Sequence, residues 1–579
     1  MKLINKIVVA ISFLGATAVF SSCSKDFLEK YPQDTMTDED FWTKEENVRT
    51  FSYGFYTGFF SGYGSGYSWG NYFSGQAFND DFASTSPGEF TKIVPESGGG
   101  WSFTWVRKAN VFIERIKTVP MEEEAIAHWT GVGRFFRAME YHDLVSRFGD
   151  VPWYENVISE TDIETLYKPR DPRGVVVDKM LADLQYAAEN VRVTDVGEKG
   201  LHVNKDVVLA YMSRIMLFQG TWLKYHTTDQ ARAKTYLEAA KWAAAELINS
   251  KRYSLGNNYR DLFTSLSLTG NPEMIMYRRY VTGLLTHSLM SYNNREPQTG
   301  ISRDAVRSYL AKDGLPVDQS PLYKGDHSIA DVMTDRDPRL SQTVTPDIRL
   351  TGVNSNASTS GYAVLKFLNE TVKNEPEGSG SLNQTDAPVI RFGEVLVNYA
   401  EAAAELGNIS QSDLDMSINV LRNRAGVNMP KLEVSGQSAL VGGVAINDPE
   451  RDPTVSAILW EIRRERRVEL MMEGFRYNDL RRWKKLPTMD TNNNPKINLG
   501  AWINKDDYKD ANGKLLVENL TVVNGPTNRI GYIKPAFKPE TQRIFTGEKV
   551  YLNPLPKDQI RLYKDQGVDL KQNPGWETE

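Results

Sequence analysis

Aromatic and polar side chains that could hold a sugar ring are concentrated in a Gly- and Ser-rich stretch, residues 50–105. Sugar rings present apolar C–H faces that stack on Tyr or Trp planes, while polar side chains bind the hydroxyls. The mixture of Gly, Ser and rings is typical of loops, which lie at the surface. The candidate ligand-binding residues here are Trp69, Tyr72, Asp80, Asp81 and Phe90.

A second stretch, residues 280–300, has the same chemistry. Tyr292, Asn294 and Arg295 combine a ring, an amide and a guanidinium group within four residues. We interpret this stretch as a loop that shares the ligand with the first one. For each ring the alternative is burial in the core or at a protein interface, since aromatic residues are usually well buried.

Side-chain constellations for catalysis or metal binding are missing from the sequence. The chain has six His, none in His-x-x-x-His spacing, and it has neither a Gly-x-Ser-x-Gly elbow nor a phosphate-binding Gly loop. Asp80 and Asp81 could form a hydrolytic carboxylate pair, but a chain with 74 acidic residues offers many such pairs. We therefore predict a protein without catalysis, cofactor or metal site.

The N-terminus has the pattern of an export signal. Lys2 and Lys6 precede an apolar run over residues 7–20, which is too short to span a bilayer, and the single cysteine, Cys23, follows directly. A lone cysteine at a cleavage point favours acylation of its thiol, so we predict a signal peptide over 1–22 and a lipid anchor at Cys23. The alternative is an ordinary signal peptide with an incidental cysteine.

One segment, residues 455–485, carries seven arginines among five acidic residues. The acids lie three and four positions from arginines, a spacing that forms ion pairs within a helix. Apolar residues such as Ile458 and Ile462 add a buried stripe. We interpret the segment as one structural helix whose Arg–carboxylate pairs fix neighbouring segments. The formal net charge of -6 likewise argues against nucleic acid as a partner.

The remaining pattern predicts a mainly α fold in a single domain, residues 23–579. Apolar residues at helical spacing and small residues at contact points indicate tetratricopeptide-like hairpins over roughly 101–250 and 387–425. The segments 50–100, 254–385 and 426–579 are loop-rich and form a mixed second half. Periodicity alone leaves a generic helical bundle as an alternative.

Several motifs resemble the SusD/RagB family over nearly the whole chain. The charged segment contains Arg463-Arg464-Glu465-Arg466-Arg467-Val468-Glu469, followed by Glu473-Gly474-Phe475-Arg476. Further matches, in order along the chain, are Phe148-Gly149-Asp150-Val151-Pro152, Asp335-Arg336-Asp337-Pro338-Arg339, Asn398-Tyr399-Ala400-Glu401-Ala402, Leu421-Arg422-Asn423-Arg424-Ala425-Gly426, Tyr551-Leu552-Asn553-Pro554 and Asn573-Pro574-Gly575-Trp576. In this family such segments form the scaffold rather than the ligand site.

The resemblance implies a lipoprotein exposed on the bacterial outer membrane. It would capture an oligosaccharide and deliver it to a SusC-like TonB-dependent transporter, with ligand contacts in broadly the two aromatic stretches. Residues 88–100 depart from the pattern, because they lack tryptophans that some glycan-binding members carry. Two alternatives stay open: capture of a peptide, as in the RagB branch, and a helical-repeat scaffold that binds only protein.

Overall fold

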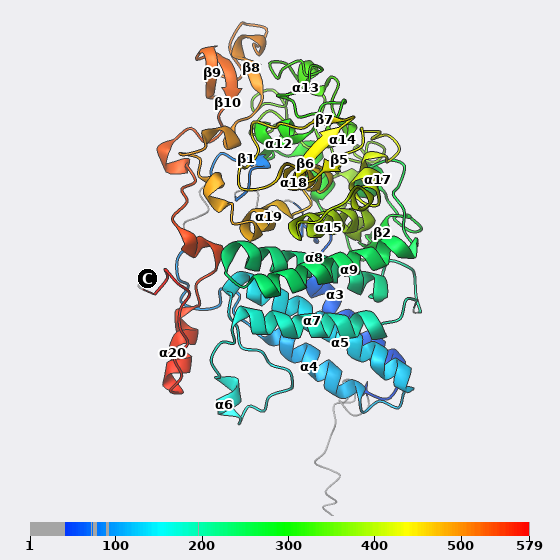
Figure 1. The fold of residues 1–579 in the computed structure, drawn as a ribbon. Helices are drawn as coiled ribbons and strands as arrows, with labels where there is room; N and C mark the ends of the chain where they lie inside the picture. The colour runs from blue at the N-terminus through cyan, green and yellow to red at the C-terminus, as the bar shows by residue number, and fades with distance from the viewer. Residues whose placement is uncertain (1–40, 71, 73–77, 88–91, 195, 578–579) are drawn as a thin grey trace, which may run out of the picture.

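The computed structural model describes residues 41–577, except 71, 73–77, 88–91 and 195. A stack of long helices forms one half of the molecule, and a second half of short helices, small sheets and loops lies on it (Figure 1). The described part contains no helix long and apolar enough to cross a membrane. The predicted mainly α architecture is confirmed.

The range 101–250, predicted as helical hairpins, contains five long helices: α4 Thr104–Ile116, α5 Glu123–Phe148, α7 Arg173–Asn190, α8 Lys205–His226 and α9 Gln230–Ser250. Neighbours in this series pack against each other, α4 on α5, α5 on α7 and α8 on α9 (Figure 1). Small residues permit the close approach. A methyl group at Gly220 of α8 would lie 2.8 Å from Leu237 Cγ of α9, so glycine is needed where these helices cross.

The prediction of a loop over the first part of 50–100 is wrong, because helix α3 spans Glu45–Phe59. Val48, Ser52 and Phe55 are buried at helical spacing, and two glycines allow contact with α4: a methyl group at Gly58 would lie 2.7 Å from the Trp105 ring. These glycines, which suggested a loop, serve helix packing.

The predicted helical pair over 387–425 is only partly correct. Residues Ala387–Arg391 form strand β4, paired with β2 (Met274–Arg278), and helix α15 then runs over Phe392–Glu405. The second member is broken into α16 Gln411–Asp415 and α17 Ile418–Arg422. Helix α15 packs on both α8 and α9 and also on α18 (Ala457–Glu469), so it joins the helical stack to the second half.

The described residues of the second half form four small antiparallel sheets, with strand orders β1-β3, β2-β4, β5-β6-β7 and β8-β10-β9. Their remaining strands are β1 Phe82–Ala83, β3 Gly300–Ile301, β5 Glu433–Ser435, β6 Ser438–Val441, β7 Val444–Ala445, β8 Trp502–Asn504, β9 Val522–Thr527 and β10 Ile530–Ile533. Short α-helices among the described residues are α6 Ile163–Leu166, α10 Asp261–Thr264, α11 Leu289–Arg295, α12 Arg303–Ser308, α13 Ile329–Met333, α14 Pro338–Thr343 and α20 Lys557–Asp565.

The arginine-rich segment is two helices rather than one, α18 Ala457–Glu469 and α19 Arg476–Arg482. Between them Met472 and Gly474 have φ of 66° and 85°, a left-handed conformation that a continuous helix cannot contain. Most of its ion pairs also differ from the expected intrahelical kind. Arg464–Glu461 at 3.0 Å follows the helical spacing, whereas Glu465, Glu469 and Glu473 pair with distant segments.

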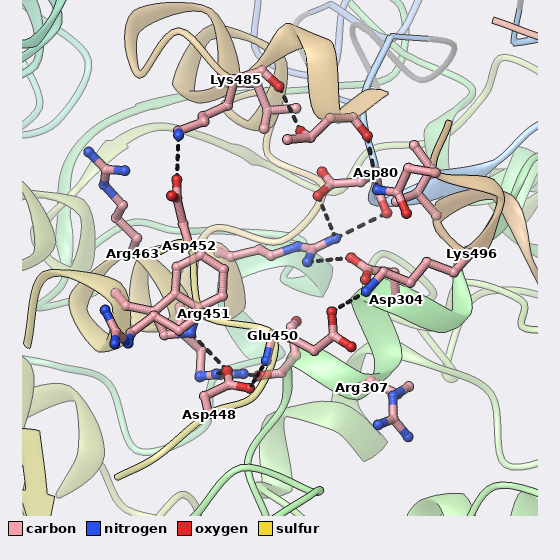
Figure 2. A pocket seen from close by; sticks show the side chains of 18 of the residues that line it. Asp80, Asp304, Arg307, Asp448, Glu450, Arg451, Asp452, Arg463, Lys485 and Lys496 are labelled. Atoms are coloured by element: carbon pink, nitrogen blue, oxygen red, sulfur yellow. Dashed lines mark hydrogen bonds and ion pairs between the residues drawn. The ribbon is translucent and has the colours of Figure 1, made fainter. Parts of the chain in front are cut away.

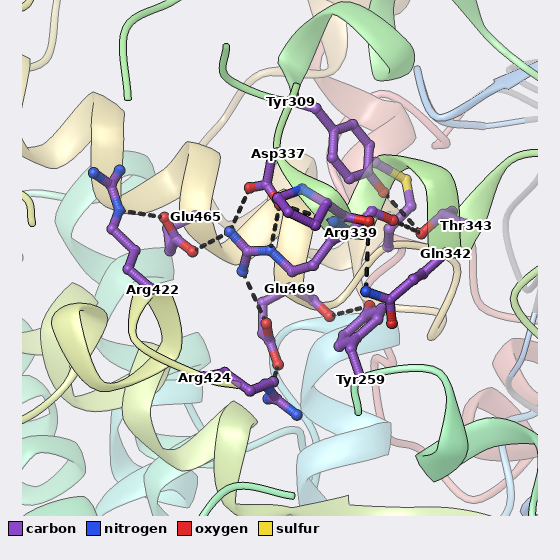
Figure 3. Close-up of polar contacts among 12 residues, drawn as sticks. Tyr259, Tyr309, Asp337, Arg339, Gln342, Thr343, Arg422, Arg424, Glu465 and Glu469 are labelled. Atoms are coloured by element: carbon purple, nitrogen blue, oxygen red, sulfur yellow. Dashed lines mark hydrogen bonds and ion pairs between the residues drawn. The ribbon is translucent and has the colours of Figure 1, made fainter. Parts of the chain in front are cut away.

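Glu469 is the centre of these pairs. Its carboxylate, 0% exposed, accepts from Arg339 (2.9 Å), Arg391 (2.7 Å) and Arg424 (2.7 Å), and Figure 3 shows the part of this network around Arg339. Burial alone would raise the pKa of Glu469, but Arg424, Arg391 and Arg339 lower it to about 2. The predicted role of α18 in fixing its neighbours is therefore confirmed.

Candidate functional site

The segment between Phe60 and Tyr72 carries both buried and exposed aromatic rings. Tyr63 and Tyr72 are buried, and their hydroxyls donate to the carbonyls of Phe263 (2.9 Å) and Pro388 (2.8 Å). Tyr67, between them, is 79% exposed. Glycines make the tight path possible: Gly64 has φ of 76°, and a methyl group there would lie 2.6 Å from the Ser68 carbonyl oxygen.

Trp69 and Tyr292 form an aromatic pair at the surface. Their ring centroids lie 4.1 Å apart with the planes inclined at 32°, although 223 positions separate them in the sequence. Trp69 Nε1 donates to Ser288 Oγ at 3.1 Å, and Tyr292 Oη accepts from the Thr299 backbone N–H at 3.0 Å. Both rings are half-buried. The two predicted stretches thus meet, although Tyr292 belongs to the short helix α11 rather than to a loop.

Polar groups surround this pair. Asn294 Nδ2 donates to the Lys373 carbonyl at 2.7 Å, and the exposed Arg295 reaches the same oxygen at 3.4 Å. Tyr67 lies beside a third segment, since a methyl group at Gly380 would be 3.5 Å from its hydroxyl oxygen. Rings, an amide and a guanidinium group from two parts of the chain, with residues 373–380 beside them, therefore form one surface, which we call the aromatic face.

The other predicted ligand residues lie elsewhere. Tyr72 is buried against β4. Asp80 and Asp81, expected at the surface, are 5% and 3% exposed. Both Asp80 oxygens accept from Arg476 at 2.7 Å, and Asp81 accepts from Arg467 Nε at 2.8 Å. These carboxylates hold the segment before α4 against α18 and α19, a role that the sequence reasoning missed.

The pKa values of this pair follow from burial and from those guanidinium groups. Burial raises the pKa of both acids. For Asp80 the charges of Arg467 and Arg476 outweigh it and bring the pKa below its usual value, whereas for Asp81 burial prevails and the pKa is raised.

Phe90 and Cys23, the remaining predicted site residues, lie outside the described residues.

A charged cavity of about 470 Å³ lies between α12, α18, α19 and residues 448–453. Figure 2 shows its carboxylates joined to basic partners. Asp452 pairs with Lys485 at 2.5 Å and Asp304 with Arg467 at 2.8 Å, while Glu450 pairs with Lys496. Burial raises the pKa of Asp452, but the hydrogen bonds from Lys485 and Thr454 outweigh it and lower the pKa. The carboxylates of this cavity are therefore engaged by basic groups of the protein itself.

The described ranges also contain no group of three or more His, Cys, Asp or Glu side chains placed to hold a metal ion. Tyr67 is a surface ring of the aromatic face that the sequence did not lead us to predict as a ligand residue. Its position between Gly66 and Ser68, two residues from Trp69, was the available signal.

Comparison with known proteins identifies the family. Residues 288–576 match the model of the SusD family. SusD-like protein P38 of Formosa agariphila is 24% identical over 515 residues, covering 84% of this chain and 93% of that protein. Two solved structures from Bacteroides fragilis have the same fold: a SusD-like protein (TM-score 0.65, 23% identity, 94% of this chain and 100% of that chain) and a SusD-like carbohydrate-binding protein (0.64, 22%, 90% and 99%). The chain belongs to the SusD family and is a non-catalytic binding protein rather than an enzyme.

Proposed function

We propose that the protein captures an oligosaccharide at the aromatic face. The Trp69–Tyr292 pair carries this proposal, because two half-buried rings from distant segments lie 4.1 Å apart, and aromatic rings are the side chains on which the apolar faces of sugars stack. Asn294 and Arg295 stand next to the rings to bind hydroxyls. A relative with the same fold is described as carbohydrate-binding, which supports the same ligand class.

The proposal includes a place and a partner. Cys23, acylated after removal of residues 1–22, would anchor the chain in the outer membrane with the aromatic face outside the cell. A SusC-like TonB-dependent transporter would then receive the captured glycan. Peptide capture remains the second candidate, favoured by the exposed Arg295, which could pair with a peptide carboxylate as readily as with a hydroxyl.

Calorimetry with an oligosaccharide panel and a peptide panel tests the ligand class. Trp69→Ala and Tyr292→Ala should each weaken glycan binding about tenfold, since stacking contributes on the order of 1–2 kcal/mol per ring. Trp242→Ala is the matched control, because Trp242 is an exposed tryptophan on helix α9 of the other half. Unchanged glycan affinity in both aromatic-face variants would contradict this site. Binding of peptides without binding of any oligosaccharide would show that the ligand is a peptide.

The anchor has its own test. Cys23→Ala should leave the chain folded and move it from the outer-membrane fraction to the soluble fraction, since one thiol carries the acyl chains. An unchanged membrane fraction would show that something other than Cys23 holds the protein there.

A further inference from the structure

A second cavity, of about 870 Å³, lies at the seam between the two halves. Its walls come from α5, α8, α19, strand β4 and the segment after α3, and none of them includes Trp69 or Tyr292. Exposed residues such as Ser102, Thr104 and Asn478 stand at its rim, whereas its inner wall is buried. The volume lies in the range of pockets for small molecules.

Glu140, on the α5 wall, sets this cavity apart. Its side chain is only 8% exposed, yet within the described part of the chain it has no hydrogen-bond or ion-pair partner. Burying a carboxylate without a partner is costly, and proteins normally avoid it. Burial raises the pKa of Glu140 to about 7, with the neighbouring Asp143 adding to the rise.

The other charges in the cavity wall are satisfied by the protein. Asp143 pairs with Arg147 at 2.9 Å, and the Arg214 guanidinium donates to both oxygens of Glu394 at 2.6 Å. Further along the wall, Asp479 accepts from Arg466 at 2.8 Å. These pairs leave no open charge at their positions.

Arg481 is the arginine of this wall with no carboxylate partner among the described residues. Its guanidinium donates to the carbonyls of Ser146 (2.5 Å) and Tyr551 (2.8 Å) and to the Asn478 side chain (3.2 Å). Its Nε–H and the Ser146 hydroxyl have no hydrogen-bond partner in the described part of the chain. Glu140 is the carboxylate of this wall that no described residue pairs, and its two oxygens are acceptors left to a ligand.

We propose that this cavity binds a small ligand with a protonated amine, of the size of an amino sugar, whose ammonium group pairs with Glu140. An ammonium supplies three donors and the missing positive charge. Trp105, Phe218 and Phe475 in the wall give apolar area for the body of such a ligand. The site is independent of the aromatic face and of the function proposed there.

Calorimetry at pH 7 with glucosamine and glucose tests the proposal, because the two sugars share a ring and differ by an ammonium in place of a hydroxyl. Glucosamine should bind at least tenfold more tightly than glucose. Glu140→Gln should abolish that preference while Trp69→Ala leaves it unchanged. Glu140→Asp keeps the charge on a shorter side chain and should retain part of the preference. A thermal melt of each variant establishes that it is folded.

Several results would overturn the site: no detectable binding of glucosamine, equal affinity for the two sugars, or an undiminished preference in Glu140→Gln. Loss of glucosamine binding in Trp69→Ala would move the ligand to the aromatic face instead. Failure of Trp69→Ala to affect oligosaccharides, with the glucosamine preference intact, would count against the aromatic face alone.

Discussion

Two buried glutamates in this molecule, Glu469 and Glu140, have opposite surroundings. Three arginines surround Glu469, and their charges lower its pKa to about 2. Glu140 has no protein partner in the described chain, and its pKa rises to about 7. Burial acts on both in the same direction, so counter-charge decides the outcome. Glu469 fixes neighbouring segments through its ion pairs, whereas the oxygens of Glu140 can still accept hydrogen bonds from a ligand.

Removing the charge of Glu469 should have the largest effect. Glu469→Gln leaves Arg339, Arg391 and Arg424 with one negative charge fewer inside the protein, and breaking a buried pair costs about 3–5 kcal/mol. We expect a large fall in the free energy of unfolding, measured by urea denaturation. Glu548→Gln is the control, since Glu548 pairs with Lys484 at the surface and should cost less than about 1 kcal/mol. Equal losses in the two variants would refute the structural role of Glu469.

Neutralising Glu140 should raise the free energy of unfolding, by less than Glu469→Gln lowers it. Folded Glu140 takes up its proton near pH 7 and unfolded Glu140 near 4.5, so the folded chain binds more protons between these values. Its contribution to stability therefore falls as pH rises from about 5 to 7. Glu140→Gln removes this pH dependence. The free energy of unfolding should therefore rise by about 2–3 kcal/mol at pH 8 and hardly change at pH 4.

The groups around Glu140 are the same in variant and wild type, so the difference between the two isolates Glu140. Burial and then nearby arginines lower the pKa of His142 to about 3, which gives both proteins the same additional pH dependence. The check is the difference between variant and wild type in urea denaturation, measured from pH 4 to 8. A difference independent of pH would contradict the unpaired state of Glu140. Asp143, the remaining acid beside it, is common to both proteins.

The aromatic face should change stability least. Trp69→Ala removes a half-buried ring outside the ion-pair network, and we expect less than about 1 kcal/mol in the free energy of unfolding. Its effect should appear in glycan affinity instead. A melting temperature lowered as far as that of Glu469→Gln would mean that the ring is part of the core.

The sequence predicts the helical stack well because its signal is local. Apolar spacing and stops such as Pro120 and Gly149 define α4 and α5. The charged segment shows the limit: its helical pattern continues through Met472, where the backbone turns left-handed. Gly474 was the local sign of the break.

The site shows a second limit. That Trp69 meets Tyr292 could be expected from the family resemblance, but Asp80 and Asp81 gain their arginines only through the tertiary fold. Glu140 reads in the sequence as an ordinary polar position of an amphipathic helix. Only the tertiary structure, which places residues of β4 and α19 in the wall of the same cavity, reveals that Glu140 lines a pocket.

The Asp81–Arg467 contact joins residues 386 positions apart. A chain emerging from the ribosome or crossing a membrane therefore presents residue 81 long before its partner exists. Contacts of such sequence separation form slowly, because the entropy of closing a long loop is lost first. The junction of the segment before α4 with α18 is then completed late, and a chain ended before residue 467 lacks the arginines that hold Asp80 and Asp81.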